Sequence, residues 1–156
     1  MSYVFDNVPL SVLFKTYYRA RFPTLWFRFD ALVANGHVVS TREVLREIND
    51  GPIESLRNWA NANSALFAAP TAAEGQFVSR IYAVVHFQQN IEQQKILKGG
   101  NVADPFVIAR AAVEGRSVVT MEALKPNSAR IPNICQHFKI GCLSLEQFME
   151  QEEWEF

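Results

Sequence analysis

The feature that most constrains the fold is a series of short, apolar runs of β-prone residues that alternate with longer segments of helical periodicity. The runs lie at residues 3–5, 38–39, 66–68, 117–120 and 140–143. In parallel sheets, which helices cover on both faces, the strands are short continuous apolar runs. We therefore expect an α/β protein, a three-layer α/β/α sandwich around a mostly parallel sheet of about five strands.

Sequence signals also predict where several helices start and stop. Two Ser/Thr-x-x-Glu sequences, at residues 40–43 and 71–74, have the pattern of a capping box, in which the leading hydroxyl caps a helix. The pair Asp104-Pro105 predicts a further helix start, and Gly115 predicts the end of that helix. Helices therefore separate the predicted strands along most of the chain.

The length of 156 residues fits one domain, so we expect a single domain over residues 1–156. No apolar stretch approaches the ~20 residues that a membrane-spanning helix needs. The first six residues lack the basic region of a signal peptide. We therefore expect a soluble, cytoplasmic protein.

The net charge of −1 hides an uneven distribution. Five glutamates and no Lys or Arg lie in residues 143–156, and we expect 144–156 to form an acidic C-terminal helix or tail. The rest of the chain keeps 11 of the 16 acidic residues against all 15 basic ones. Such a body suits a polyanionic partner, whereas the alternative is an ordinary domain with a solvated acidic tail.

Polar and acidic residues recur where the predicted strands end and at two positions in the predicted helices. Ligand sites of open α/β sheets form beyond the carboxyl ends of the strands, and a helix start can lie at the same edge. Residues 6, 40 and 120 end or follow three predicted strands, residue 122 lies two positions further, and residues 47 and 104 lie on helices. The set is Asp6, Ser40, Glu47, Asp104, Thr120 and Glu122. We expect these side chains to share one edge of the sheet.

Each carboxylate alone has an ordinary structural interpretation. Asp6 fits a turn, Glu47 a solvated helix position and Asp104 a helix start, where acids are favoured. Glu122 fits a loop. Four carboxylates brought together, however, repel one another, and a divalent cation would offset that repulsion.

The donor types narrow the chemistry of such a cluster. An all-oxygen set without Cys or His disfavours zinc and suits Mg²⁺ or Mn²⁺. The reaction that follows is metal-assisted hydrolysis of a phosphodiester. The sequence has no Walker loop and no Gly-x-Gly-x-x-Gly, which disfavours binding of nucleoside triphosphates and dinucleotides.

With these residues in place, the chain resembles the PIN-domain superfamily, whose bacterial members include toxin ribonucleases of the VapC type. More narrowly, it resembles an uncharacterised bacterial PIN-like subfamily. The resemblance covers nearly the whole chain, and the pair formed by Ala-Asp-Pro at 103–105 and Val-Val-Thr-x-Glu at 118–122 is its most specific part. The other segments that carry it are residues 3–6, 21–26, 40–48, 106–109 and 130–135.

The resemblance implies a five-stranded parallel sheet and an Mg²⁺- or Mn²⁺-dependent endoribonuclease, the toxin of a bacterial type II toxin–antitoxin pair. Asp6, Glu47, Asp104 and Glu122 match the four acids of the family in order. Thr120 matches the small hydroxyl residue that precedes the fourth acid. The implied partners are an RNA substrate, a cognate antitoxin and a second copy of the chain.

Asn7 departs from the family pattern, which places Thr or Ser directly after the first acid. An amide can still donate and accept hydrogen bonds, but it is bulkier. This departure favours an alternative hypothesis, a catalytically impaired PIN-like module that binds RNA or protein. Under the nuclease hypothesis we expect Arg42, Lys125 and Arg130 to contact RNA phosphates, although each also fits ordinary surface charge.

A small phosphatase of another α/β family is a third hypothesis. It would need an Asp-x-Asp pair after the first strand, and the sequence Asp6-Asn7-Val8 lacks the second acid. The sequence therefore favours the nuclease over the phosphatase.

Overall fold

The structure is a computed structural model that describes residues 1–97 and 102–156. Its sheet consists, in these residues, of four parallel strands in the order β2-β1-β3-β4. The strands are β1 (Tyr3–Phe5), β2 (Val38–Val39), β3 (Ser117–Val119) and β4 (Cys142–Leu143). Val4 pairs with Val39 on one side and with Val118 on the other. The central strand β1 therefore ends between two neighbours that run in the same direction.

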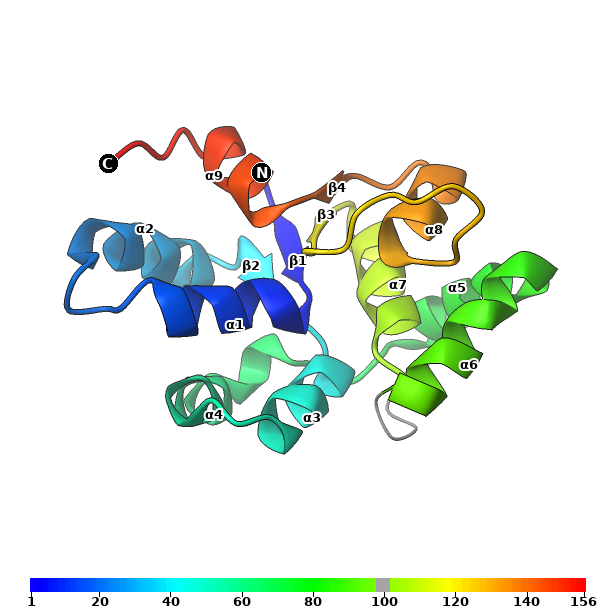
Figure 1. The fold of residues 1–156 in the computed structure, drawn as a ribbon, viewed down its shortest axis with the longest axis horizontal. Helices are drawn as coiled ribbons and strands as arrows, with labels where there is room; N and C mark the ends of the chain where they lie inside the picture. The colour runs from blue at the N-terminus through cyan, green and yellow to red at the C-terminus, as the bar shows by residue number, and fades with distance from the viewer. Residues whose placement is uncertain (98–101) are drawn as a thin grey trace.

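Helices cover both faces of the sheet, so the predicted α/β sandwich is confirmed. Figure 1 shows α1 and α2 on one side of the sheet and α7 with α5 on the other. The helices are α1 (Asn7–Thr16), α2 (Pro23–Ala34), α3 (Arg42–Asp50), α4 (Glu54–Ala62), α5 (Ala72–Ala83), α6 (Gln88–Leu97), α7 (Asp104–Glu114), α8 (Ile131–Phe138) and α9 (Leu145–Gln151). Two short 3-10 helices are η1 (Ser64–Leu66) and η2 (Val85–Phe87).

The strand expected at residues 66–68 does not form, which leaves four strands in the described residues instead of about five. The segment begins with Leu66, the last residue of η1, and runs beside the end of β2. The amides of Ser40 and Arg42 donate to the carbonyls of Leu66 and Ala68 at 3.0 and 3.1 Å. The guanidinium of Arg110 also donates to the Leu66 carbonyl, at 2.9 Å. The segment is therefore held at the edge of the sheet by a 3-10 turn and two backbone hydrogen bonds, and it does not form a strand.

One of the two predicted capping boxes is confirmed and the other is wrong. Thr71 and Glu74 form the predicted box at the start of α5. At the start of α3, Thr41 is the N-cap, and its hydroxyl accepts from the Val44 amide at 3.2 Å. The Ser40 hydroxyl instead donates to the Phe5 carbonyl at 2.6 Å. Ser40 therefore ties the end of β2 to the end of β1.

The helix predicted from Asp104 to Gly115 is confirmed. Asp104 is the first residue of α7, and Pro105 follows it in the first turn. Gly115 ends the helix with φ 68°, a left-handed conformation that glycine adopts without steric cost. The sequence signals at both ends of this helix therefore fixed its bounds.

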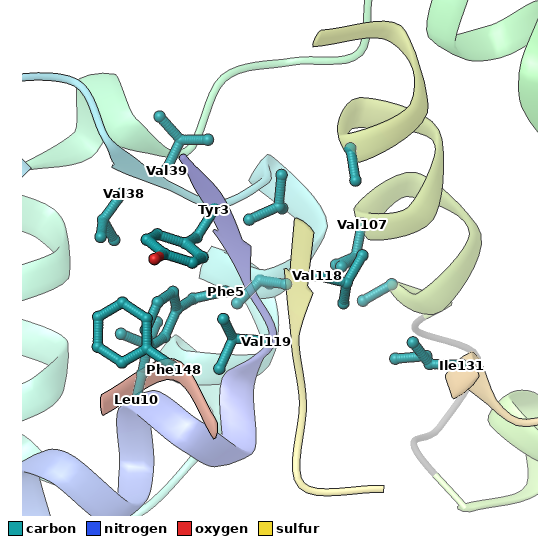
Figure 2. Packing of buried hydrophobic residues seen from close by; sticks show 14 of the residues in the cluster. Tyr3, Phe5, Leu10, Val38, Val39, Val107, Val118, Val119, Ile131 and Phe148 are labelled. Atoms are coloured by element: carbon teal, nitrogen blue, oxygen red, sulfur yellow. The ribbon is translucent and has the colours of Figure 1, made fainter. Parts of the chain in front are cut away.

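The C-terminal segment packs on the core through aromatic rings. Figure 2 shows Phe148 of α9 beside Tyr3, Phe5 and Leu10, all of them buried. The Phe148 ring meets Tyr3 and Phe5 edge to face, with centroids 4.7 and 5.0 Å apart. Trp154 packs on Phe148 in turn, at 5.2 Å. The acidic residues predicted as a helix or tail thus begin in a helix that is anchored to β1.

Candidate functional site

Asp6 and Thr120 meet at the carboxyl end of the sheet. They directly follow the neighbouring strands β1 and β3, and they are 3% and 1% exposed. The Thr120 hydroxyl donates to Oδ2 of Asp6 at 3.1 Å. The other carboxylate oxygen of Asp6 accepts from the amide of Asn7, at 2.8 Å, and so caps α1. Asp6 is therefore held in one orientation by the sheet edge and by the helix that it starts.

Glu122 continues this network toward α8. Its amide donates to the Thr120 hydroxyl at 3.2 Å, and its Oε2 accepts from the amide of Ile131 at 2.9 Å. Ile131 is the first residue of α8, where Arg130 is the N-cap and gives no side-chain hydrogen bond. A carboxylate at a helix N-terminus satisfies an amide that the helix leaves unpaired. One oxygen of Glu122 is thus committed to holding α8.

Asp104 is the most buried of the predicted acids, at 1% exposed, and it lies in the first turn of α7. Its Oδ2 accepts from the side-chain amide of Asn90 on α6 at 3.0 Å. The same amide nitrogen donates to the carbonyl of Ala129 at 3.0 Å. Sequence reasoning missed Asn90, because a single asparagine in a helix carries no pattern that reveals its tertiary partner.

Glu47 lies on α3 and is 9% exposed. It lines a cavity of about 50 Å³ together with Asn7, Ser11 and Leu56. The Ser11 hydroxyl donates to the side-chain oxygen of Asn7 at 3.2 Å. Glu47 and Asn7, the residue that follows Asp6, thus line the same small cavity.

The thiols of Cys135 and Cys142 are under the influence of three of the predicted acids. The pKa of the Cys135 thiol is raised by a hydrogen bond with Cys142, by burial and by the negative charges of Glu122 and Asp104. The pKa of the Cys142 thiol is lowered by its hydrogen bond with Cys135, whereas burial and the negative charges of Glu122 and Asp6 act to raise it. Asp6, Asp104 and Glu122 each act on one or both of these thiols through their charges. Cys142 itself lies on β4, the strand next to β3.

The predicted RNA contacts differ in their surroundings. Lys125 and Arg130 are exposed on the segment between β3 and α8 that also carries Glu122. Arg42 is exposed on α3, and its guanidinium pairs with Glu43 at 3.1 Å. Glu43, which is 4% exposed, is a second buried acid of α3, and the sequence predicted it only as part of a capping box and not as a site residue.

The donor chemistry of the site suits a hard cation, since carboxylate and hydroxyl oxygens line the sheet edge. The spacing does not yet form a metal cage: within residues 1–97 and 102–156, no group of three or more His, Cys, Asp or Glu is arranged to hold an ion. In this arrangement the carboxylates make protein contacts, of which Asp6–Thr120, Asp104–Asn90 and Glu122–Ile131 are examples.

In the part of the chain that the structure describes, no helix is both long enough and apolar enough to cross a membrane.

Among solved structures, the fold is similar to a chain in the crystal structure of VapBC2 from Rickettsia felis bound to a DNA fragment from their promoter. The TM-score is 0.52 at 14% sequence identity, and the match covers 92% of this chain and 98% of the other. At this identity the likeness concerns the fold, which is PIN-like.

No curated protein matches the chain in sequence. A family model described as a domain of unknown function, DUF4411, matches residues 3–156. Because this match spans nearly all of the sequence, the chain belongs to the DUF4411 family.

Proposed function

We propose that this protein is a metal-dependent endoribonuclease that hydrolyses RNA phosphodiester bonds. The observation that carries the proposal is the buried polar network at the carboxyl end of the sheet, in which Thr120 links Asp6 to Glu122. Asp104 is connected to this network through Asn90, which donates both to Asp104 and to the carbonyl of Ala129, two residues before the Ile131 amide that donates to Glu122. Buried acids gathered at this edge of an α/β sheet are typical of a site.

In this proposal Asp6, Glu47 and Asp104 hold Mg²⁺ or Mn²⁺, and Glu122 supports the ion from the α8 side. A bound divalent ion supplies the electrophilic activation of the phosphoryl group that phosphodiester hydrolysis needs. The chain itself orients the acids: Thr120 fixes Asp6, and Asn90 fixes Asp104. Lys125 and Arg130, exposed beside Glu122, would contact the RNA phosphates, as would Arg42.

The fold likeness to VapBC2 supports the further proposal that the protein is the toxin of a type II toxin–antitoxin pair and works in the cytoplasm. A cognate antitoxin would present Arg to the acidic edge, where charge-assisted hydrogen bonds to carboxylates are strong. We extend the proposal to a homodimer. The ring of Phe27 on α2, 77% exposed, offers apolar area for it.

The second candidate function is a catalytically impaired PIN-like module that binds RNA or protein. Two observations favour it. Asn7 stands where the PIN-domain superfamily, which the chain resembles, has Thr or Ser, and its side chain accepts from Ser11. In addition, the acids of the described residues are not spaced as a metal cage. A protein of this kind would bind RNA without cleaving it.

Cleavage of a labelled RNA in Mn²⁺ tests the proposed function. The wild type should cleave, and Asp6→Asn and Asp104→Asn should reduce cleavage to background with an unchanged circular dichroism spectrum. Asp30→Asn is the matched control, because Asp30 is an exposed acid on α2 that pairs with Arg19. Undiminished cleavage in both site variants would refute the site.

Calorimetric titration with Mn²⁺ separates the two candidates. The nuclease should bind the ion, and Asp104→Asn should weaken that binding. Absence of Mn²⁺ binding by the wild type, together with retained RNA binding, would favour the impaired module.

A further inference from the structure

Asn90 is a buried side chain that joins three segments of the chain. It lies on α6 and is 2% exposed. Its amide nitrogen donates at 3.0 Å to Oδ2 of Asp104, at the start of α7, and at 3.0 Å to the carbonyl of Ala129, just before α8. Figure 1 shows α6, α7 and α8 on the same side of the sheet. Both hydrogens of this amide are therefore used between different elements.

The contact with Ala129 connects Asn90 to the fourth acid. Ala129 lies two residues before Ile131, whose amide donates to Oε2 of Glu122. Glu122 in turn bonds to Thr120, and Thr120 bonds to Asp6. Asp104 is thus connected to Asp6 by a series of buried and half-buried hydrogen bonds that begins at Asn90. The backbone between Ala129 and Ile131 completes the series.

The chemistry of an amide suits this position. A buried polar group costs free energy unless it is hydrogen-bonded, and a carboxylate needs donors. The Asn90 amide supplies one donor to a carboxylate that is 1% exposed. The second hydrogen of the amide is donated to the Ala129 carbonyl. Because this acceptor belongs to the backbone, its position does not change when a side chain rotates. The direction in which the Asp104 carboxylate points is therefore set relative to the segment that holds Glu122.

We propose that Asn90 is a positioning residue that fixes the carboxylate of Asp104 relative to the backbone that holds Glu122. Its effect on cleavage rests on the proposed nuclease function, whereas its effect on the 129–131 segment does not. Residues that orient a metal-binding carboxylate typically change activity by about 10–100-fold when they are replaced.

The test compares Asn90→Leu, which has similar volume and no donor, with Asn90→Ser, which keeps one short donor. We expect Asn90→Leu to lower kcat in Mn²⁺ by about 10–100-fold with KM changed less than about threefold. Asn90→Ser should recover part of the loss. In parallel, the Ile131 amide should exchange its hydrogen faster in Asn90→Leu, because its segment loses a tether.

The control is Asn61→Leu. Asn61 also donates twice through its amide, to Asn49 and to the Arg57 carbonyl at 2.7 Å each, but it is exposed on α4. This variant should keep the wild-type kcat and the wild-type exchange at Ile131. The same loss in Asn61→Leu would show that the assay reports general destabilisation and would overturn the proposal.

The outcomes separate the two proposals. Wild-type exchange at Ile131 in the Asn90 variants overturns the positioning role, whether or not cleavage falls. If wild-type protein does not cleave RNA in Mn²⁺, the proposed function fails, and Ile131 exchange alone decides the role of Asn90. If Asn90→Leu does not fold, Asn90→Ser decides it by the same measurement.

Discussion

The Thr120 hydroxyl lies 3.1 Å from Oδ2 of Asp6, although 114 positions separate the two residues in the sequence. The contact forms because β1 and β3 are neighbouring parallel strands, with Phe5 paired to Val119. Residues that follow two such strands must meet at the same edge of the sheet. The pairing of the short strands β1 and β3 therefore brings together the two residues at the centre of the candidate site.

Replacement of Thr120 by Val should destabilise the protein by about 1.5–3 kcal/mol, because it removes a hydrogen bond to a buried charged group. It also removes the acceptor for the Glu122 amide. Unfolding in urea measures the change. Thr120→Ser keeps the hydroxyl and serves as the control, and it should lose less stability than Thr120→Val. Equal stability of Thr120→Val and wild type would contradict the importance of this bond.

Glu122 should stabilise α8 through its acceptor oxygen more than through its charge. Glu122→Gln keeps an oxygen for the Ile131 amide, whereas Glu122→Ala removes it. We expect Glu122→Ala to cost about 1 kcal/mol, as the loss of a helix cap does, and Glu122→Gln to cost less. Thermal unfolding followed by circular dichroism checks the ranking, and the reverse order would argue against a capping role.

Arg110 helps to hold the segment for which the sequence predicted a fifth strand. Its Nη1 donates to the carbonyls of Ser40 and Leu66, and so ties α7 to the end of β2 and to the last residue of η1. Arg110→Met should lower the free energy of unfolding by about 1.5–3 kcal/mol, since hydrogen bonds from a charged donor are lost. Arg46→Met, at an exposed arginine of α3, is the control and should change it little. A urea midpoint shared by both variants would contradict the prediction.

Glu114 should make the stability of the protein depend on pH. Burial opposes its ionisation, but hydrogen bonds from Arg110 and Arg116 outweigh burial and hold the pKa of Glu114 below its ordinary value of 4.5. A carboxyl group with a lowered folded-state pKa stabilises the fold above its unfolded pKa, and that contribution is lost as pH falls through the folded pKa. Wild type should thus be more stable than Glu114→Gln at pH 7.

The difference between wild type and Glu114→Gln should shrink as pH falls below about 4.5, where the unfolded chain already binds the proton. Urea unfolding at a series of pH values from neutral to acid measures it. A difference between the two proteins that stays constant over this range would show that the ion pairs are not its source.

Local signals in the sequence were sufficient for several elements. The Asp104-Pro105 start and the Gly115 end of α7 were predicted correctly, because Pro in the first turn and a left-handed Gly are properties of single positions. The capping box of Thr71 and Glu74 was also correct, since both partners lie within one turn. The capping box predicted from the same pattern at residues 40–43 was wrong, because the Ser40 hydroxyl donates to the carbonyl of Phe5 in another strand.

The sequence by itself determined the α/β class, since continuous apolar strands between helices have to be covered on both faces. It also predicted Asp6 directly after one strand and Thr120 at the end of another, and in the structure both residues directly follow the neighbouring strands β1 and β3. Only the tertiary structure decided that residues 66–68 dock without a ladder, that Glu122 caps α8 and that Asn90 holds Asp104. These contacts join side chains to groups of other elements. Their geometry depends on how the helices pack on the sheet, which no local pattern of residues encodes.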